Sequence, residues 1–204
     1  MLNGVPVWEL MAGRSETVAT LVIPEEDQTL TVMKRFGGDG SPLRWRRPPR
    51  LEAYSYRSRK PRPLGDIGPF LPGTLVLGEK AHAALGPFLA RFGQLLPIDV
   101  GGVPHWFFNA THLVSCIDPA HSEPYTTGTI GKEAFIDAAI PTEAAVFKDP
   151  LTARARLYAN EAGRRALEAL AAMAGVRGLL FVRAGLSGQA SPKAHAAARP
   201  GPSP

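Results

Sequence analysis

Residues 156–183 read RLYANEAGRRALEALAAMAGVRGLLFVR, and this stretch predicts a strand at 156–158, a helix and a second strand in succession. Asn160 is a favourable N-cap residue, and Glu161 places a negative charge in the first helical turn, where it suits the helix dipole. Gly175 supplies a stop signal, and the apolar run 179–182 predicts the second strand. Apolar residues spaced three or four apart form one stripe of the helix: Ala162, Ala166, Leu167, Leu170 and Met173.

An earlier part of the chain repeats this order. Residues 75–77 predict a strand, residues 79 to about 90 a helix, and residues 95–98 another strand. The helical stripe consists of Ala81, Ala84, Leu85 and Phe88. The two helices align at one constant offset, with Glu79 matching Glu161. An internal duplication and convergence on a common pattern both explain this likeness.

Shorter β-rich segments surround these two units. Residues 5–11 predict an opening strand, and Pro6 favours an edge position for it. Further strands are expected at 17–23 and 29–34 (a hairpin across an acidic turn), 51–56, 106–108 and 113–117, with weaker candidates at 135–136 and 144–147. The pattern as a whole predicts an α+β fold, in which an N-terminal antiparallel β region accompanies two strand-helix-strand units on a mixed sheet.

Length and composition predict one α+β domain over residues 1–186. Residues 187–204 contain no apolar residue larger than alanine, so we expect them to form a disordered tail. Cys116 is the only cysteine, which excludes an internal disulfide and favours a reducing compartment. No secretory signal pattern begins the sequence and no apolar run approaches the length of a membrane span, so we expect a cytoplasmic protein that does not bind membranes.

The positive charge is concentrated between residues 44 and 62. This segment holds eight basic residues and one acid, whereas the whole chain has a net charge of +5. Trp45, Tyr54 and Tyr56 alternate with the arginines, as is typical where bases stack and phosphates pair. A solvated edge strand and an arginine-rich surface for an acidic protein are the two other interpretations.

Candidate catalytic and metal-binding residues are few. His112, Cys116, Asp118 and His121 are the densest group, and a strand could place the first three on one face. The alternative is an inward Cys116 that packs as a small apolar residue, followed by a turn at Asp118-Pro119. The sequence contains no G-x-S-x-G elbow, and its glycine loop at 37–40 lacks the Lys-Ser/Thr of a phosphate loop. We therefore expect no enzyme activity, no cofactor and no metal site.

The order of motifs from Asp66 to Ser122 is more specific. Asp66-Ile67 is followed by Gly73-Thr74-Leu75-Val76-Leu77-Gly78-Glu79-Lys80-Ala81, then by Leu95-Leu96-Pro97-Ile98, Trp106-Phe107-Phe108-Asn109 and Leu113-Val114-Ser115-Cys116-Ile117-Asp118. Together with residues 144–148 and 156–182, this order resembles the eleventh family of immunity proteins of bacterial polymorphic toxin systems, over about residues 66–183. Gly78 departs from the family, which usually has a capping serine there. The basic segment and the tail are not family features.

The resemblance implies a protein that neutralises a cognate toxin by stoichiometric binding and occlusion, with no catalytic residue. The alternatives are a nucleic-acid-binding protein acting through residues 44–62 and a hydrolase centred on Cys116 and His121. The sequence does not specify the oligomeric state. The candidate partner-binding residues are Arg44, Trp45, Arg46, Arg47, Arg57, Arg59 and Trp106.

Overall fold

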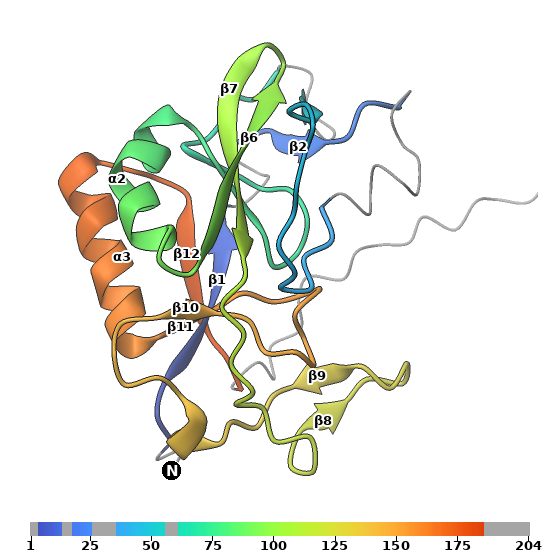
Figure 1. Cartoon of the computed structure of the whole chain (residues 1–204), viewed down its shortest axis with the longest axis vertical. Coiled ribbons are helices and arrows are strands. Elements are labelled where there is room, and N and C mark those ends of the chain that lie inside the picture. The colour runs from blue at the N-terminus through green and yellow to red at the C-terminus, as the bar shows by residue number, and fades with distance from the viewer. Residues whose placement is uncertain (1–3, 14–17, 26–35, 56–60, 186–204) are drawn as a thin grey trace, which may run out of the picture.

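The computed structural model describes residues 4–13, 18–25, 36–55 and 61–185 (Figure 1). Within these ranges, two α-helices and several strands make up a mixed α+β fold, which confirms the predicted fold class. The strands form a six-stranded sheet, a four-stranded sheet and a small two-stranded sheet. No helix in the described ranges is long and apolar enough to cross a membrane.

The six-stranded sheet has the order β2-β3-β6-β7-β5-β4. Its members are β2 (Thr20–Val22), β3 (Arg50–Tyr54), β4 (Ile67–Gly68), β5 (Leu75–Leu77), β6 (Gly93–Val100) and β7 (Val103–Ala110). The β6–β7 hairpin pairs over its whole length, and all neighbours are antiparallel except β3 and β6. The sheet is therefore mixed.

The four-stranded sheet has the order β10-β11-β1-β12 and is antiparallel throughout. Its members are β1 (Val7–Ala12), β10 (Val146–Phe147), β11 (Tyr158–Asn160) and β12 (Leu179–Arg183). The N-terminal strands thus do not form a region of their own, because β1 lies in this sheet and β2 in the other. The expected edge position of the first strand is wrong: Pro6 precedes the first paired residue, so its missing amide costs β1 no ladder hydrogen bond.

Both predicted strand-helix-strand units are present, but they lie on two separate sheets and not on the one mixed sheet expected, and each contains one additional strand. Helix α2 (Glu79–Leu89) connects β5 to β6, and α3 (Glu161–Ala174) connects β11 to β12. In each unit a third, antiparallel strand lies between the two parallel ones: β7 in the first and β1 in the second. The two helices pack side by side on the same side of the molecule (Figure 1). The units therefore share a topology, which either duplication or convergence would explain.

Local sequence sets the ends of the helices. The Asn160 side chain caps α3 by accepting a hydrogen bond from the amide of Gly163 (2.8 Å), as predicted. A Cβ atom at Gly163 would lie within van der Waals overlap of the Ala145 carbonyl, so only glycine lets the helix approach this closely. Gly175 ends α3 in the left-handed conformation, with φ of 63°. Gly78 gives α2 no side-chain cap.

The remaining elements lie between β7 and β10. They are β8 (Glu123–Pro124), β9 (Ile130–Lys132) and the short 3₁₀ helix η2 (Asp137–Ala139). The strand expected at 113–117 is wrong, because this segment makes only isolated bridges at Leu113 and Ile117. The reason is a contact with a distant residue: the amides of Cys116 and Ile117 both donate to the Asp149 carboxylate, at 2.8 Å, instead of to a neighbouring strand.

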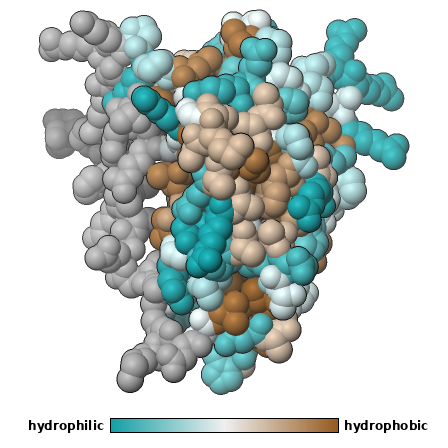
Figure 2. Space-filling view, turned by 90° about the vertical axis from the view of Figure 1, so that its left-hand side faces the viewer, coloured by the Kyte–Doolittle hydropathy of each residue, from teal (hydrophilic) through white to brown (hydrophobic). Residues whose placement is uncertain are grey.

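Of the other expected strands, residues 51–56 correspond to β3 and residues 146–147 to β10. The first arm of the predicted hairpin contains β2, which pairs with β3, and the second arm, 29–34, lies outside the described residues. The predicted tail also lies outside them. The helix-bearing side of the molecule shows apolar surface over its centre, edged by hydrophilic residues (Figure 2).

Candidate partner-binding surface

The basic segment begins as an exposed strip of arginines that extends to the first residue of β3. Arg44, Arg46, Arg47 and Arg50 are all exposed. Trp45, in contrast, is half-buried, and its ring packs against Phe36 and Phe107 with centroid distances of 5.7 Å to each. Trp45 therefore anchors the strip to the core of the six-stranded sheet. The candidate residues Arg57 and Arg59 lie outside the described residues.

Two amide side chains position the start of this strip. Gln94 on β6 accepts from the amide of Leu43 (2.7 Å) and donates to its carbonyl (3.1 Å), as a neighbouring strand would. Asn109, opposite Gln94 on β7, donates to the Ser41 carbonyl (2.9 Å) and to Gln94 Oε1 (3.0 Å). Residues 41–43 are thereby held against the β6–β7 hairpin, and the arginines that follow project from a fixed backbone.

Trp106 lies on the other face of the same sheet. Successive residues of a strand point to opposite faces, so Trp106 points away from the side on which Phe107 contacts Trp45. Its ring stacks on His82 of α2, with centroids 3.9 Å apart and planes 5° from parallel. Burial lowers the pKa of His82, which favours its neutral form in this stack. The structure thus divides the candidate residues between two faces.

Cys116 and His121 occupy different environments. Cys116 is fully buried, and burial, assisted by the nearby Asp149 carboxylate, raises the pKa of its thiol to about 12. A thiol with this pKa stays protonated at neutral pH, whereas nucleophilic cysteines need an accessible thiolate. His121 is exposed and its Nδ1 lies 2.7 Å from Asp118 Oδ2. No group of three potential metal ligands occurs among the described residues.

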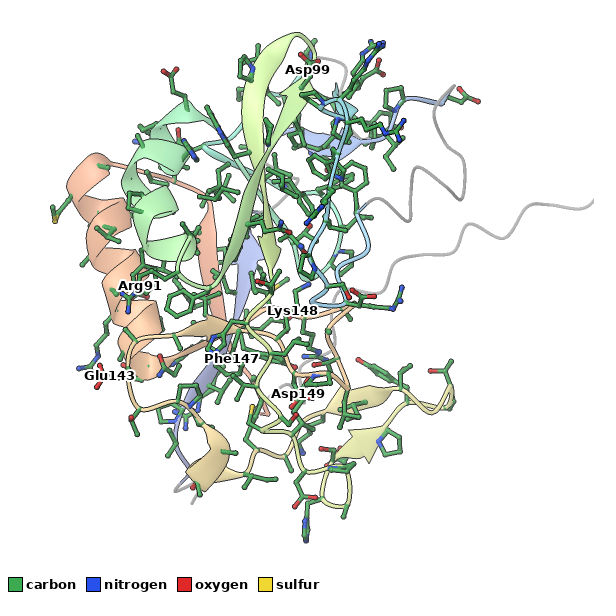
Figure 3. The ribbon with its side chains drawn as sticks, in the orientation of Figure 1. Arg91, Asp99, Glu143, Phe147, Lys148 and Asp149 are labelled. Atoms are coloured by element: carbon green, nitrogen blue, oxygen red, sulfur yellow. The ribbon has the colours of Figure 1, made fainter. Side chains whose placement is uncertain are left out.

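Sequence reasoning missed a buried lysine and aspartate at residues 148 and 149. Figure 3 shows both beside Phe147, where the β8–β9 part of the chain meets the two main sheets. The Lys148 ammonium donates to the carbonyls of Gly38 and Ala153 (2.9 Å to the latter). Asp149 accepts from three backbone amides, those of Cys116, Ile117 and Leu151, at 2.8 Å each. Both side chains therefore hydrogen-bond to backbone groups of loops, which in a regular strand would pair with another strand.

A second buried charge network ties residues 131–133 to the four-stranded sheet. Arg156 lies 2.8 Å from Glu133 Oε1 and 3.1 Å from Glu9 Oε2, and its NH2 group donates to the Gly131 carbonyl (3.0 Å). The hydroxyl of Tyr158 also donates to Glu133 Oε1 (3.0 Å). The pKa of Glu9 is raised, because burial and the Glu133 charge together outweigh Arg156, which lowers it. The Glu133 side chain is fully buried, and Arg156 and Glu9 are 14% and 20% exposed, so the network mainly links buried backbone and side chains.

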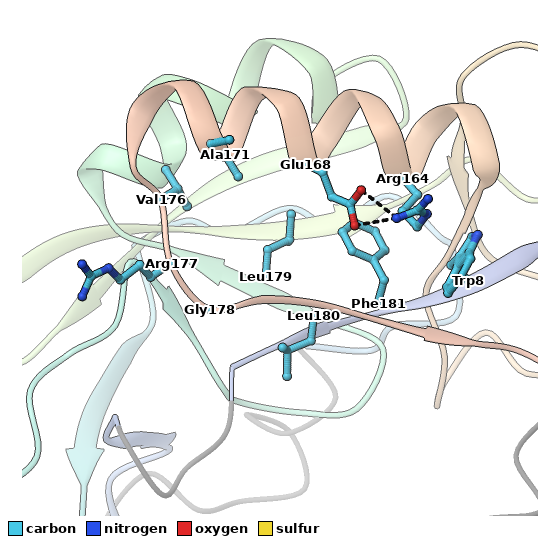
Figure 4. A pocket seen from close by; sticks show the side chains of 11 residues that line it. Trp8, Arg164, Glu168, Ala171, Val176, Arg177, Gly178, Leu179, Leu180 and Phe181 are labelled. Carbon is cyan, nitrogen blue, oxygen red and sulfur yellow. Dashed lines mark hydrogen bonds and ion pairs between the residues drawn. The ribbon is translucent and has the colours of Figure 1, made fainter.

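A groove opens between α3 and β12. Figure 4 shows Leu179 and Phe181 of β12 pointing toward the helix, with Trp8 at one end and Arg177 at the other. The hollow has a volume of about 510 Å³. Arg164 crosses its helix side, paired with Glu168 (2.7 Å) and Glu161 (2.8 Å), and its guanidinium lies over the Trp8 ring (4.6 Å). No sequence motif marks this groove, because it forms where the helix and strand meet.

No protein-family model and no curated protein matches this chain. The resemblance to the immunity-protein family therefore stays a prediction. The structural findings that bear on partner binding are the arginine strip anchored by Trp45 and the groove beside β12.

Lys148 leads to a prediction about pH. Burial lowers the pKa of its ammonium from 10.5 to about 8, while Asp39 opposes this change. Between pH 8 and 10.5 the unfolded chain keeps a proton that the folded protein has released, so the stability of the folded state rises with pH in this window. The neutral amine still has two N–H groups for its two carbonyl partners. Relative to the Lys148→Met variant, the unfolding free energy of the wild type should rise by about 2 kcal/mol between pH 7 and pH 10.

Urea denaturation of both proteins at the two pH values measures this gain, since titrations elsewhere in the chain affect both proteins equally. A constant difference in unfolding free energy across the range would mean that Lys148 stays charged in the folded protein.

Proposed function

We propose that this protein is a cytoplasmic, non-catalytic immunity protein that binds a toxin protein and occludes its active surface. The observation that carries the binding proposal is the exposed arginine strip held on a fixed backbone by Trp45. Arginine beside a partly buried aromatic ring is a frequent anchor in protein interfaces. The toxin part of the proposal rests on the order of motifs along residues 66–183.

The packing of Trp45 favours a protein partner over nucleic acid. Single-stranded nucleic acid binds by stacking its bases on open aromatic rings. The Trp45 ring is instead engaged with Phe36 and Phe107, and Tyr54, which is 51% exposed, is the remaining described aromatic residue of the segment. The positively charged arginines would face an acidic surface of the partner protein, and such charge complementarity mainly speeds association.

The mechanism we propose is occlusion by a preformed surface. Asn109, Gln94 and Trp45 hold the strip before any partner arrives, so little ordering entropy is lost on binding. The pKa of about 12 for the Cys116 thiol supports a role without covalent chemistry.

The decisive experiment is co-expression with the product of the adjacent gene. We expect a toxin-bearing protein to co-purify in a stoichiometric complex that persists at 300 mM salt and suppresses the toxin's activity. Reversal of three of the four arginines of the strip, in the triple variant Arg44→Glu, Arg46→Glu and Arg47→Glu, should slow association by about tenfold or more, because it inverts the net charge of the strip. Stopped-flow or surface-based kinetics measure this rate.

A matched control reverses three exposed arginines elsewhere, in Arg91→Glu, Arg154→Glu and Arg165→Glu, and should leave association much less affected. Nucleic-acid binding is tested in the same samples. Sub-micromolar affinity for duplex or single-stranded DNA at 150 mM salt, lost in the strip variant but kept in the control, would replace this proposal by the nucleic-acid one.

A further inference from the structure

The outer edge of β12 has no strand neighbour among the described residues. Its other edge pairs with β1, where Glu9 faces Val182 and Met11 faces Leu180. Just beyond the strand, the amide of Ala184 donates to the Val7 carbonyl (2.9 Å). Bonded and non-bonded pairs alternate along an antiparallel ladder.

The alternation fixes which backbone groups of β12 are available. The amides and carbonyls of Leu179, Phe181 and Arg183 point away from β1, toward the open edge. The same three residues direct their side chains toward α3, because they share a face with Trp8, Leu10 and Ala12 of β1. An added strand would therefore meet unused hydrogen-bonding groups and the groove together.

The groove combines an apolar floor with positive ends. Leu179 and Phe181 are only half-buried and line the floor. Arg164 is neutralised by Glu161 and Glu168. Arg177 lines one end of the groove; its side chain makes no ion pair with a described acid, although its backbone amide donates to the Asp66 carboxylate (2.8 Å), which pairs with Lys80. Arg183 is the last residue of β12, beyond the Trp8 end of the groove, and its side chain also makes no ion pair among the described residues. Arg183 only lies over the Trp8 ring, at 6.0 Å. The edge thus suits a strand that is apolar in its middle and acidic at both ends.

Two other candidate occupants, the C-terminal tail and a second copy of the chain, fit the positive charges of the groove less well. Residues 187–204 contain Lys193 and Arg199 and no aspartate or glutamate, so they match neither end of the groove. A second copy pairing through β12 would bring its own Arg177 and Arg183 into the same positive region, and like charges close together oppose such pairing.

We propose that β12 and α3 form a docking site for an extended acidic segment of another protein, which binds by β-strand addition. Its backbone would pair with Leu179, Phe181 and Arg183, and alternate apolar side chains would enter the groove toward α3. Aspartate or glutamate at the ends of the segment would meet Arg177 and Arg183. This site is separate from the arginine strip, and it does not depend on the proposed function.

The test uses a fluorescent peptide, Asp-Thr-Val-Thr-Val-Thr-Asp with capped ends, whose palindromic pattern fits either strand direction. We expect saturable binding to the full chain, seen by fluorescence anisotropy. Two kinds of control peptide should bind about tenfold more weakly or worse. The first is Lys-Thr-Val-Thr-Val-Thr-Lys. The second is the acidic peptide with N-methyl groups on alternate backbone amides, made in two versions so that each set of alternate amides is blocked once. The first probe removes the charge match and the second removes the strand hydrogen bonds.

Protein variants then locate the site. In the double variant Arg177→Glu and Arg183→Glu, affinity for the acidic peptide should fall by about tenfold, and the lysine peptide should bind more tightly than the acidic one. Val182→Glu changes an exposed residue on the opposite face of β12 and should bind the acidic peptide nearly as the wild type does. Circular dichroism checks that both variants fold, and the reversed preference of the double variant is itself a gain that an unfolded protein would not show.

Several outcomes would overturn the proposal. Equal binding of the acidic and lysine peptides, undiminished binding after N-methylation, or no binding at millimolar peptide would each do so. Tenfold tighter binding after truncation at Gly185 would assign the edge to the tail, and a concentration-dependent dimer abolished by the double variant would assign it to a second copy. Whether the double variant still co-purifies the toxin is measured separately, so a failure of this docking proposal can be told apart from a failure of the proposed function.

Discussion

The Arg156→Met variant is expected to lose about 3–5 kcal/mol of unfolding free energy, because it leaves a buried carboxylate without its cation. The side chain of Glu133 is completely buried, that of Arg156 is 14% exposed, and the two meet at 2.8 Å. Oε2 of Glu133 has no hydrogen-bond partner among the described residues, so it has little with which to replace the arginine. Urea denaturation at pH 7 measures the loss.

Two companions make the Arg156 prediction specific. Arg154→Met removes an arginine whose side chain is 76% exposed and 3.3 Å from Asp39, and it should cost less than about 1 kcal/mol. In Arg156→Met, Glu9 also loses the cation that lowers its pKa, so the pKa of Glu9 should rise further, and the loss should shrink as the pH falls and Glu9 takes up a proton. A loss below about 1 kcal/mol at pH 7 would show that solvent reaches Glu133.

The sequence predicted those parts of the fold that depend on neighbouring residues. The cap at Asn160, the stop at Gly175 and the apolar runs beside them all act within a few residues, and α3 and β12 formed as expected. The strand expected at 156–158 lies two residues later, as β11, and runs directly into the cap residue Asn160. The position of β1 between β11 and β12 depends on residues more than 140 positions away. Pro6 favoured an edge, but it lies just outside the paired residues and does not constrain β1.

The candidate surface likewise has features that depend on neighbouring residues and features that depend on distant ones. Alternation along a strand is a local property, and by itself it places Trp106 and Phe107 on opposite faces. What local pattern could not indicate is that Phe107 faces Trp45, more than 60 residues earlier in the sequence. Lys148 and Asp149 gave no signal, because charged residues are normally exposed and their buried partners are backbone groups of distant loops.

The order of motifs in residues 66–183 and the charge of residues 44–62 came from the sequence, whereas the groove beside β12 came from the structure alone. The sequence shows Arg177 and Arg183 as two unremarkable basic residues. Only the pairing of β12 with β1 reveals that the other edge of β12 has no strand neighbour in the described part of the chain and that both arginines lie along it.

Leu167→Asp is expected to abolish soluble folded protein. Leu167 is completely buried in the core under α3, where it packs among residues of both main sheets and of α2. An aspartate there would lose the burial of the leucine and place an unpaired charge in an apolar environment, a combined cost of several kcal/mol that matches the whole stability of many domains. Soluble yield and circular dichroism after expression measure the outcome.

Met173→Asp is the matched control for Leu167→Asp. It introduces the same side chain six residues later in the same helix, but Met173, which the sequence pattern wrongly placed on the apolar stripe, is 84% exposed. The change should therefore alter the unfolding free energy by less than about 1 kcal/mol. The pair separates the effect of burial from that of aspartate in a helix. If Leu167→Asp folded normally, the face of α3 that carries Leu167 would have to be a surface, and both the core described around it and the groove that this core supports would be wrong. If Met173→Asp also failed to fold, the outer face of α3 would be covered in the native protein, which would point to a partner or a second copy on the helix side.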